Sequence, residues 1–229
     1  DVQIDWEKKY LDMADVIVFW VPRDMKTLPG LTTHVEFGMY YDSGKAMLAY
    51  PDKTPHMGYL AAHGKSEGVP IFNDLKSVLQ AAVGRIGDGA ERSGGERDVP
   101  LHIWRTKQFE NWYREQKAAG NRLDGARVLW NFRSGPKKDF VFLYILEVNM
   151  YVTAEGRNKT NEFVISRPDI AGVVAYYRDG SSNDMQALLN AEVVIIREFR
   201  SSASVRDAFV REIPGGSSWA DEDSSLDIA

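Results

Sequence analysis

The clearest chemical candidate in the sequence is a glutamate, Glu36, which lies among apolar residues in the segment PGLTTHVEFGMYYDSGK. Thr33 precedes Glu36 by three residues, and this spacing is typical of a capping box at the start of a helix. In such a box the Thr33 hydroxyl accepts from the Glu36 amide and the Glu36 carboxylate accepts from the Thr33 amide. The spacing alone therefore favours a structural role for Glu36.

A catalytic role for Glu36 follows from its place along the chain. The apolar run ADVIVFWVP, residues 14–22, precedes it and predicts a buried strand, and ligands of open α/β sheets collect beyond the carboxyl ends of the strands. A helix N-terminus favours an ionised carboxylate by ~0.3–1 kcal/mol. An ionised, partly desolvated carboxylate is a competent nucleophile toward the anomeric carbon of a sugar. Four aromatic residues would exclude water from it: Phe19, Trp20, Phe37 and Tyr40.

The elements around Glu36 predict a βαβ unit with a parallel sheet. Apolar residues at helical spacing alternate with short β-branched runs, and Gly44 closes the helix that carries Glu36. Asn73 is the predicted N-cap of a later helix. The expected order is a helix at 5–13, a strand at 14–22, a helix at 33–43, a strand at 45–50 and a helix at 72–84.

The stretch QIDWEKKYLDMADVIVFWVPRDMKTLPGLTTHVEFGMYYDSGKAMLAYPD, followed by YLAAHGKSEGVPIFNDLKSVL, resembles the nucleoside 2-deoxyribosyltransferase-like family. The resemblance covers residues 1–83 and implies a flavodoxin- or Rossmann-like sheet, a homo-oligomer and no cofactor. It makes Glu36 the nucleophile that takes up the glycosyl group. The substrate-binding residues that we predict with it are Asp15, Trp20, Arg23, Asp24 and Thr33.

Two features depart from that family. Pro29, Gly30 and Leu31 occupy the place of a loop aspartate, for which Asp24 and Asp15 are candidate substitutes. Asp15 at the start of a buried strand is also typical of a structural hydrogen-bonding residue. The chain begins after the first strand and helix of the family fold, which help to form the base pocket.

The second half of the chain has a different character. Residues 84–98, GRIGDGAERSGGERD, are rich in glycine and charge, and we interpret them as a linker between domains at 1–83 and 99–229. Beyond it we expect an α+β domain, with EGRNKTNEF (155–163) as a solvated loop. Its predicted elements are a helix at 106–121 and strands at 126–132, 139–152, 170–180 and 191–200.

The C-terminal segments VVIIREFR and REIPGG, with the spacing G-x5-E from Gly216 to Glu222, resemble Nudix hydrolases of the ADP-sugar pyrophosphatase type. The resemblance places Arg200 and Glu212 near the substrate, and Gly215 and Glu222 near Mg²⁺. Three of them have a plain alternative: Arg200 as a strand-end surface charge, Glu212 as an edge-strand charge and Glu222 as part of a solvated acidic run. The main metal ligands of that family would follow residue 229, so we expect no pyrophosphate hydrolysis from these 229 residues and a requirement for Mg²⁺ only in a complete Nudix domain.

Composition narrows the classes of function. The chain has 229 residues, a formal net charge of −5 and no cysteine. The charge disfavours a nucleic-acid partner, and the missing thiols exclude disulfides and a cysteine nucleophile. With no long apolar run and no signal sequence, we expect a cytoplasmic protein without a membrane partner.

Three hypotheses follow. The first is an enzyme that cleaves or transfers at the N-glycosidic bond of a nucleoside or nucleotide through Glu36, fused to a Nudix domain for nucleoside diphosphate derivatives. In the second, only the Nudix domain is catalytic and the N-terminal domain senses a nucleotide. In the third, the chain is a binding or assembly module without turnover.

Overall fold

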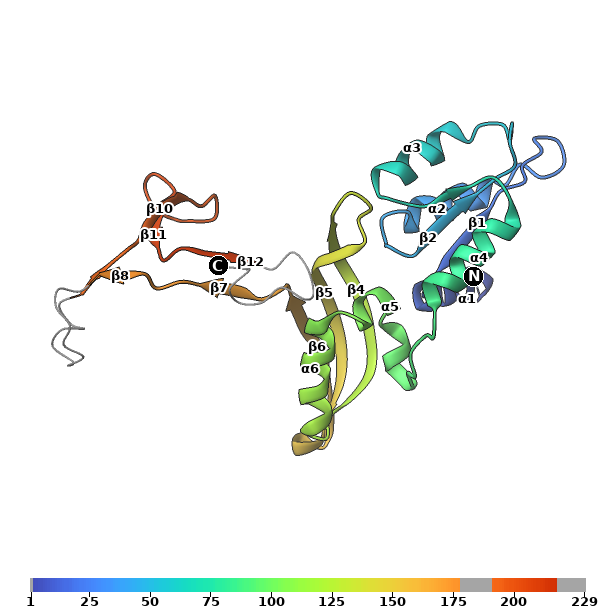
Figure 1. Cartoon of the computed structure of the whole chain (residues 1–229). Coiled ribbons are helices and arrows are strands. Elements are labelled where there is room, and N and C mark those ends of the chain that lie inside the picture. The colour runs from blue at the N-terminus through green and yellow to red at the C-terminus, as the bar shows by residue number, and fades with distance from the viewer. Residues whose placement is uncertain (1, 178–190, 218–229) are drawn as a thin grey trace. The chain divides into compact units, whose positions relative to one another are not determined.

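The computed structural model describes residues 2–177 and 191–217. The chain divides into two compact units, Asp1–Arg167 and Pro168–Ala229, each of which is described by itself (Figure 1). The mixed α/β class with a parallel sheet, predicted from sequence, is confirmed. Among the described helices, none has the length and apolar character needed to cross a membrane.

The first unit opens with alternating helices and strands. Its strands are parallel in the order β1-β2-β3, with Ile17 opposite Ala46 and Leu48 opposite Ile71. The predicted βαβ unit is therefore confirmed. The elements are α1 (Val2–Met13), β1 (Ile17–Trp20), α2 (Leu31–Tyr40), β2 (Ala46–Ala49), α3 (Gly58–Ser66), β3 (Ile71–Phe72) and α4 (Leu75–Ile86).

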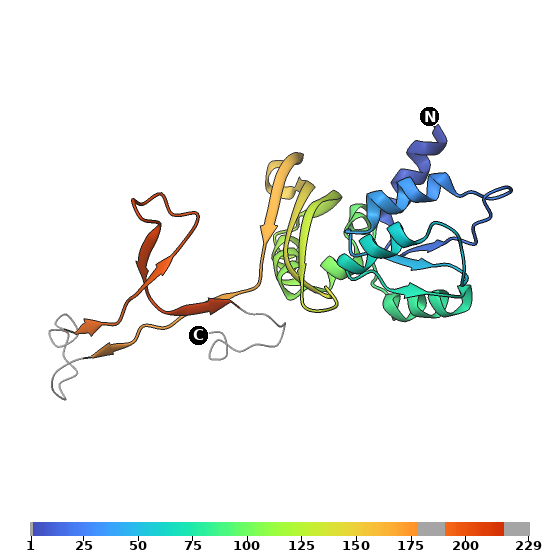
Figure 2. The same ribbon diagram turned by 90° about the horizontal axis from the view of Figure 1, so that it is seen from above.

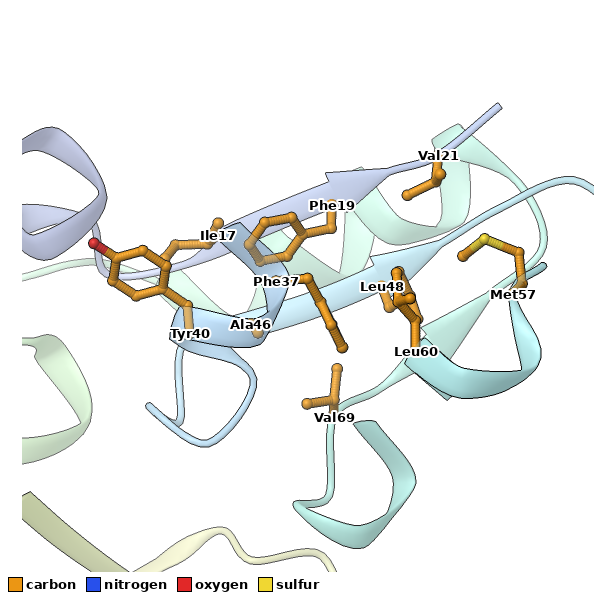
Figure 3. Packing of buried hydrophobic residues seen from close by; sticks show 10 residues of the cluster. All are labelled: Ile17, Phe19, Val21, Phe37, Tyr40, Ala46, Leu48, Met57, Leu60 and Val69. Carbon is orange, nitrogen blue, oxygen red and sulfur yellow. The ribbon is translucent and has the colours of Figure 1, made fainter. Parts of the chain in front are cut away.

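Helices cover both faces of this sheet, because side chains alternate between the two sides of each strand. On one face, Phe37 and Tyr40 of α2 and Leu60 of α3 pack on residues of β1 and β2 (Figure 3). On the other face, Val78 and Ala82 of α4 pack on β2. Figure 2 shows α4 on the side of the sheet opposite α2.

The N-cap of α4 is Asp74, one residue after the predicted Asn73. The Asp74 carboxylate accepts a hydrogen bond from the Ser77 amide at 2.8 Å and another from the Ser77 hydroxyl at 2.6 Å. Both residue types are good N-caps. The prediction that Asn73 caps the helix is wrong because the sequence places two good caps side by side, and only the backbone path selects between them.

Residues 84–98, predicted as a linker, lie inside the first unit and are mostly folded. They contain the end of α4 and the 3₁₀ helix η1 (Gly94–Asp98), after which α5 (Leu101–Trp104) follows. A Cβ atom at Gly95 would lie 2.1 Å from the backbone of Asp124, so η1 approaches the next sheet too closely for any side chain there. The division into functional domains at 1–83 and 99–229 stays a prediction.

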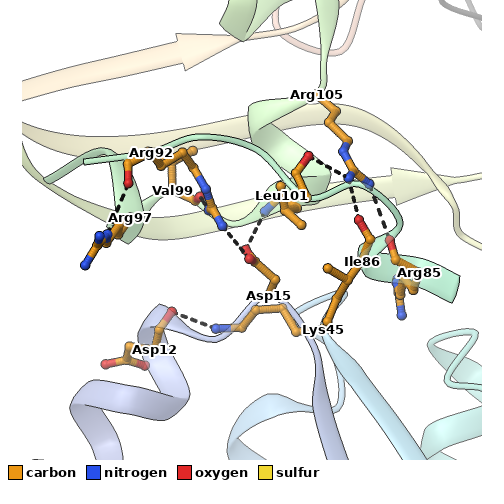
Figure 4. Close-up of polar contacts among 11 residues, drawn as sticks. Asp12, Asp15, Lys45, Arg85, Ile86, Arg92, Arg97, Val99, Leu101 and Arg105 are labelled. Atoms are coloured by element: carbon orange, nitrogen blue, oxygen red, sulfur yellow. Dashed lines mark hydrogen bonds and ion pairs between the residues drawn. The ribbon is translucent and has the colours of Figure 1, made fainter. Parts of the chain in front are cut away.

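Polar contacts hold this segment against the parallel sheet (Figure 4). The Leu101 amide donates to Oδ1 of Asp15 at 2.9 Å, and Arg92 forms an ion pair with Oδ2 of Asp15. The Arg105 guanidinium donates to the carbonyls of Arg85 and Ile86 at the end of α4. These bonds cross 19 to 86 residues of sequence, so the segment folds as part of the unit.

The first unit ends in an antiparallel sheet backed by a helix. The strand order is β4-β5-β6, and the buried core between the sheet and α6 includes Phe109, Tyr113, Leu123, Tyr144 and Leu146. Thr106 caps α6 by accepting from the Phe109 amide at 3.2 Å. The elements are α6 (Lys107–Ala118), β4 (Arg122–Ser134), β5 (Phe140–Val152), η2 (Thr153–Glu155) and β6 (Arg157–Ser166).

The prediction of a solvated loop at 155–163 is wrong, since most of that segment is strand β6. Its residues pair with β5, for example Glu162 with Val148 and Lys159 with Met150. Almost all side chains from 157 to 163 are exposed. A polar edge strand has no apolar alternation in its sequence, so its pairing with the apolar β5 decides its structure.

The described part of the second unit, residues 168–177 and 191–217, contains short strands in pairs. β7 pairs with β12, β8 with β9 and β10 with β11, all antiparallel. Apart from Pro168, no residue that the structure describes beyond Met150 is buried. The elements are β7 (Ile170–Gly172), β8 (Tyr176–Tyr177), β9 (Glu192–Val193), β10 (Ile196–Phe199), β11 (Phe209–Glu212) and β12 (Gly215–Ser217).

Candidate functional site

Helix α2 carries Glu36, but the predicted capping box is wrong. The helix begins at Leu31, and its N-cap is Gly30, which has a left-handed backbone (φ 61°, ψ 42°) and no side-chain cap. Glycine adopts this conformation without steric cost, so the chain enters the helix before Thr33. Thr33 is thus the third helical residue and Glu36 the sixth. Glu36 therefore lies beyond the first turn.

Glu36 is partly buried and lies in an acidic environment. Burial is the main cause that raises the pKa of the Glu36 carboxyl, and the negative charge of Glu7 on α1 raises it further. The expectation that a helix N-terminus would keep this carboxyl ionised is therefore wrong, because Glu36 lies outside the reach of the first-turn amides and next to another carboxylate. A desolvated carboxylate holds its proton more tightly and is a stronger nucleophile when ionised.

Tyr40 lies one helical turn after Glu36 on the same side of α2. Its hydroxyl donates to Oδ1 of Asp12 at 2.7 Å. Burial, the hydrogen bond to Asp12 and the negative charges of Asp12 and Glu36 all raise the pKa of the Tyr40 hydroxyl. We call Glu7, Asp12, Glu36 and Tyr40 the α1–α2 acidic cluster.

A buried lysine lies beside this cluster. Lys45 donates to the carbonyls of Leu11 and Asp12 at 2.7 and 2.8 Å, and its ammonium lies 5.4 Å from the centre of the Tyr40 ring. Burial lowers the pKa of Lys45 to about 8, although the charge of Asp12 opposes this shift. The Asp12 carboxylate itself pairs with Lys8 of α1, whose Nζ lies 2.6 Å from Oδ2 of Asp12.

A groove of about 1130 Å³ adjoins the cluster. Asp12 and Tyr40 line it, whereas Glu7 and Glu36 are not among its lining residues; Glu36 lies one helical turn before Tyr40. Its opposite wall comes from β4, where the Trp130 and Phe132 rings are stacked with centroids 6.2 Å apart. The groove is large enough for a nucleoside or nucleotide, since ligand pockets are typically ~300–1,000 Å³.

Sequence reasoning missed Glu7 and Asp12 and treated Tyr40 only as an aromatic that excludes water. The spacing of Glu7 and Asp12 within α1 does not tell which of them faces α2. Their roles depend on how the two helices pack, and no local pattern encodes that packing. The one available signal is that Tyr40 follows Glu36 by four residues, the spacing at which helical side chains meet.

Three predicted substrate-binding residues have other roles in the described structure. Both carboxylate oxygens of Asp15 accept hydrogen bonds, one from the Leu101 amide and one from Arg92. These contacts favour the alternative that Asp15 is a structural residue. Trp20 packs on the face of the sheet that α4 covers, opposite α2. Asp24 is exposed, and its Oδ1 accepts from the amides of Lys26 and Thr27; these hydrogen bonds lower its pKa.

Arg23, another predicted substrate-binding residue, lies at the carboxyl end of β1 and near the start of α2. It is only 7% exposed. Its Nη2 lies 2.8 Å from Nδ1 of His34, the fourth residue of α2. Thr33 is partly buried in the same helical turn. Arg23 and Thr33 are thus both held close to the N-terminus of α2, and their role in substrate binding stays a prediction.

In the second unit, Arg200 and Glu212 contact one another. Nε of Arg200 donates to Oε1 of Glu212 at 3.0 Å, and this ion pair lowers the pKa of the Glu212 carboxyl. Gly215 pairs with Gly172, and a Cβ there would lie 2.6 Å from the Ala171 carbonyl oxygen. Glu222 lies outside the described residues. Within the described ranges, no three His, Asp or Glu side chains gather into a group that would hold a metal ion.

Comparison with known proteins found no match: no protein-family model fits the chain, and no curated protein or solved structure is significantly similar to it.

Proposed function

We propose that the chain cleaves or transfers at the N-glycosidic bond of a nucleoside or nucleotide, with Glu36 as the nucleophile. The observation that carries this proposal is a partly buried carboxyl of raised pKa beside a second carboxylate, Glu7. Glycoside-cleaving enzymes use a pair of carboxyl groups, one of which acts as the nucleophile in the retaining class. The resemblance to nucleoside 2-deoxyribosyltransferase-like proteins supports the same residue.

The chemistry takes two displacements. In the first, an Oε atom of Glu36 bonds to C1′ of the sugar, the C1′–N bond breaks, and its electron pair leaves with the base. The base nitrogen takes up a proton from the solvent as the base leaves. In the second, water or another base attacks C1′ and frees the Glu36 carboxylate, so that hydrolysis or transfer results.

The Tyr40 hydroxyl orients this cluster. It donates to Asp12, and the pKa of Tyr40 is raised, so the hydroxyl keeps its proton at neutral pH. A neutral tyrosine one turn from Glu36 adds no negative charge to the repulsion between the carboxylates. Tyr40 is therefore a positioning residue in this proposal.

The substitution Glu36→Gln tests the proposal. It keeps the shape of the side chain and removes the nucleophile, so we expect release of free base from deoxynucleosides and deoxynucleotides to fall ~10³-fold or more. Chromatography of the released base measures the rate. Glu110→Gln is the matched control, because Glu110 is an exposed helical glutamate on α6.

If Glu36 only supports the fold, the Glu36→Gln protein melts at a lower temperature and its activity per folded molecule equals that of the wild type. That outcome would show that Glu36 is not the nucleophile. A wild-type protein that releases no base would instead favour the hypotheses in which the N-terminal domain senses a nucleotide or in which neither site turns over.

A further inference from the structure

The strongest independent feature of the first unit is a buried arginine without an acidic partner. Arg23 is only 7% exposed, and its Nε has no hydrogen-bond partner among the described residues. Its Nη1 donates to the carbonyls of Pro55 and His56 at 3.2 and 3.3 Å. Neutral carbonyls orient the guanidinium but do not balance its charge, and an unbalanced buried charge is costly.

Arg23 lines a small pocket. Two histidines, His34 and His56, line it with Arg23, and no Asp or Glu belongs to the lining that the structure describes. The remaining walls are apolar and come from Met25, Pro29 and Leu31. The pocket thus joins a positive charge to apolar surface, which suits an anionic group attached to an organic molecule.

The position of the pocket also favours an anion. It follows β1 at the carboxyl edge of the parallel sheet, where ligands of such sheets bind. Leu31 is the first residue of the ten-residue helix α2, so the free amides of that helix start beside the pocket. His56 has a positive φ of 57°, an uncommon conformation that persists when the surroundings enforce it.

The size of the pocket limits what enters it. Its volume is about 240 Å³, which is below the ~300–1,000 Å³ that a whole drug-sized ligand takes. A phosphate with part of a pentose therefore fits better than a complete nucleotide. The guanidinium of arginine is also the side chain best matched to phosphate oxygens.

We propose that Arg23, His34 and the N-terminus of α2 form a binding site for the phosphate of a phosphomonoester. The Arg23 guanidinium and a ring nitrogen of His34 donate to the phosphate oxygens, together with the first amides of α2. The apolar wall made by Met25, Pro29 and Leu31 contacts the attached sugar. The further step, that this phosphate belongs to a nucleoside monophosphate substrate, rests on the proposed function.

Leu31→Asp tests the site without removing the buried arginine. Leu31 is 69% exposed, and aspartate in the first turn of a helix is favourable, so the variant keeps its fold. Its carboxylate would compete for Arg23, and we expect the affinity for inorganic phosphate to fall at least tenfold in calorimetry at constant ionic strength. Leu79→Asp on α4, at a residue 48% exposed, is the matched control and should change the affinity less than twofold.

Arg23→Gln is the second variant, and it should also abolish phosphate binding if its melting curve shows a folded protein. Absence of saturable phosphate binding to the wild type would overturn the proposal, as would unchanged affinity in Leu31→Asp. Equal affinity for acetate would overturn the assignment to phosphate.

A last comparison separates this inference from the proposed function. The wild type should bind dAMP more tightly than deoxyadenosine, by a factor that Leu31→Asp removes and Glu36→Gln leaves unchanged. If Glu36→Gln keeps full base release while phosphate still binds, the proposed function fails and the phosphate site stands. Equal binding of dAMP and deoxyadenosine would show that this site does not bind the phosphate of the nucleotide.

Discussion

At the scale of single residues, His102 shows how a buried histidine sets the acid stability of the chain. Both ring nitrogens of His102 are buried and have no hydrogen-bond partner among the described residues. Burial, with the positive charges of Arg133, Arg85 and Lys45, lowers the pKa of His102 to about 3. The imidazole is therefore neutral in the folded protein throughout the physiological range.

The consequence is a loss of stability in acid. As the pH falls below about 6.5, the ordinary histidine pKa, His102 takes up a proton in the unfolded chain but not in the folded one. The free energy of unfolding then decreases by up to ~1.4 kcal/mol per pH unit until the pH reaches about 3. His102→Leu should remove this dependence. Urea titrations from pH 7 to pH 4 measure it, and an unchanged slope in the variant would contradict it.

Asp15 provides a second prediction at this scale. Its carboxylate accepts a hydrogen bond from the Leu101 amide and forms an ion pair with Arg92. Leu101 is buried and Arg92 is partly buried. Asp15→Ala leaves these two donors unpaired, and we expect it to lower the free energy of unfolding by ~2–4 kcal/mol. Base release per folded molecule should stay at the wild-type level. A stable Asp15→Ala protein with impaired activity would instead restore Asp15 to the substrate site.

At the scale of elements, the contact of η1 with β4 depends on a glycine. A Cβ at Gly95 would lie 2.1 Å from the backbone of Asp124 and Gly125. Since backbone cannot move aside cheaply, Gly95→Ala should lower the free energy of unfolding by ~1–3 kcal/mol or more. Gly84→Ala is the control: Gly84 lies inside α4 with no atom within 4 Å of the added methyl group, and alanine there should gain ~0.4–1 kcal/mol.

Thermal or urea unfolding of both glycine variants checks this pair. Similar stability of Gly95→Ala and the wild type would mean that η1 does not approach β4 as described. The pair also separates a steric effect at Gly95 from the general gain that alanine gives in place of glycine.

The elements also show what sequence reasoning captures. The βαβ order and α6 were predictable because apolar residues such as Phe109 and Tyr113 recur at helical spacing and β-branched runs mark buried strands. The start of α2 was not predictable, because Thr33 and Glu36 match a capping box. The helix instead begins at Leu31, after the left-handed Gly30. Strand β6 was not predictable either, because its residues are polar and form a strand by pairing with β5.

The candidate site was predictable only at its centre. Glu36 follows from the residues of its own segment and from the family resemblance. Its neighbour Glu7 belongs to another helix, and the partners of Asp15 lie 77 and 86 residues away in sequence. Such relations come from tertiary packing, which a linear pattern does not specify.

At the scale of the whole molecule, the two units differ in how much apolar surface they bury. Among the residues that the structure describes, the buried hydrophobic ones run from Ile17 to Met150 and belong to the first unit, and the described strands of the second unit form two-stranded pairs. Such pairs are marginally stable alone. We therefore expect amides of β10 and β11 to exchange with solvent deuterium much faster than those of β2 and β5.

Hydrogen exchange followed by mass spectrometry on the complete chain measures this difference. Protection of β10 and β11 equal to that of β5 would contradict it, and would indicate that further contacts cover the second unit in solution. The same experiment bears on the predicted homo-oligomer, because an oligomer that buries these strands would protect them in proportion to protein concentration.

The central claim is that Glu36 takes up a sugar during turnover, and trapping that intermediate tests it most directly. The chain is incubated with a nucleoside or nucleotide whose 2′-fluorine slows release of the sugar, then digested and analysed by mass spectrometry. The account predicts a glycosyl group on the peptide that contains Glu36, and none in Glu36→Gln. A glycosyl group on a different residue, or continued base release by Glu36→Gln, would contradict it.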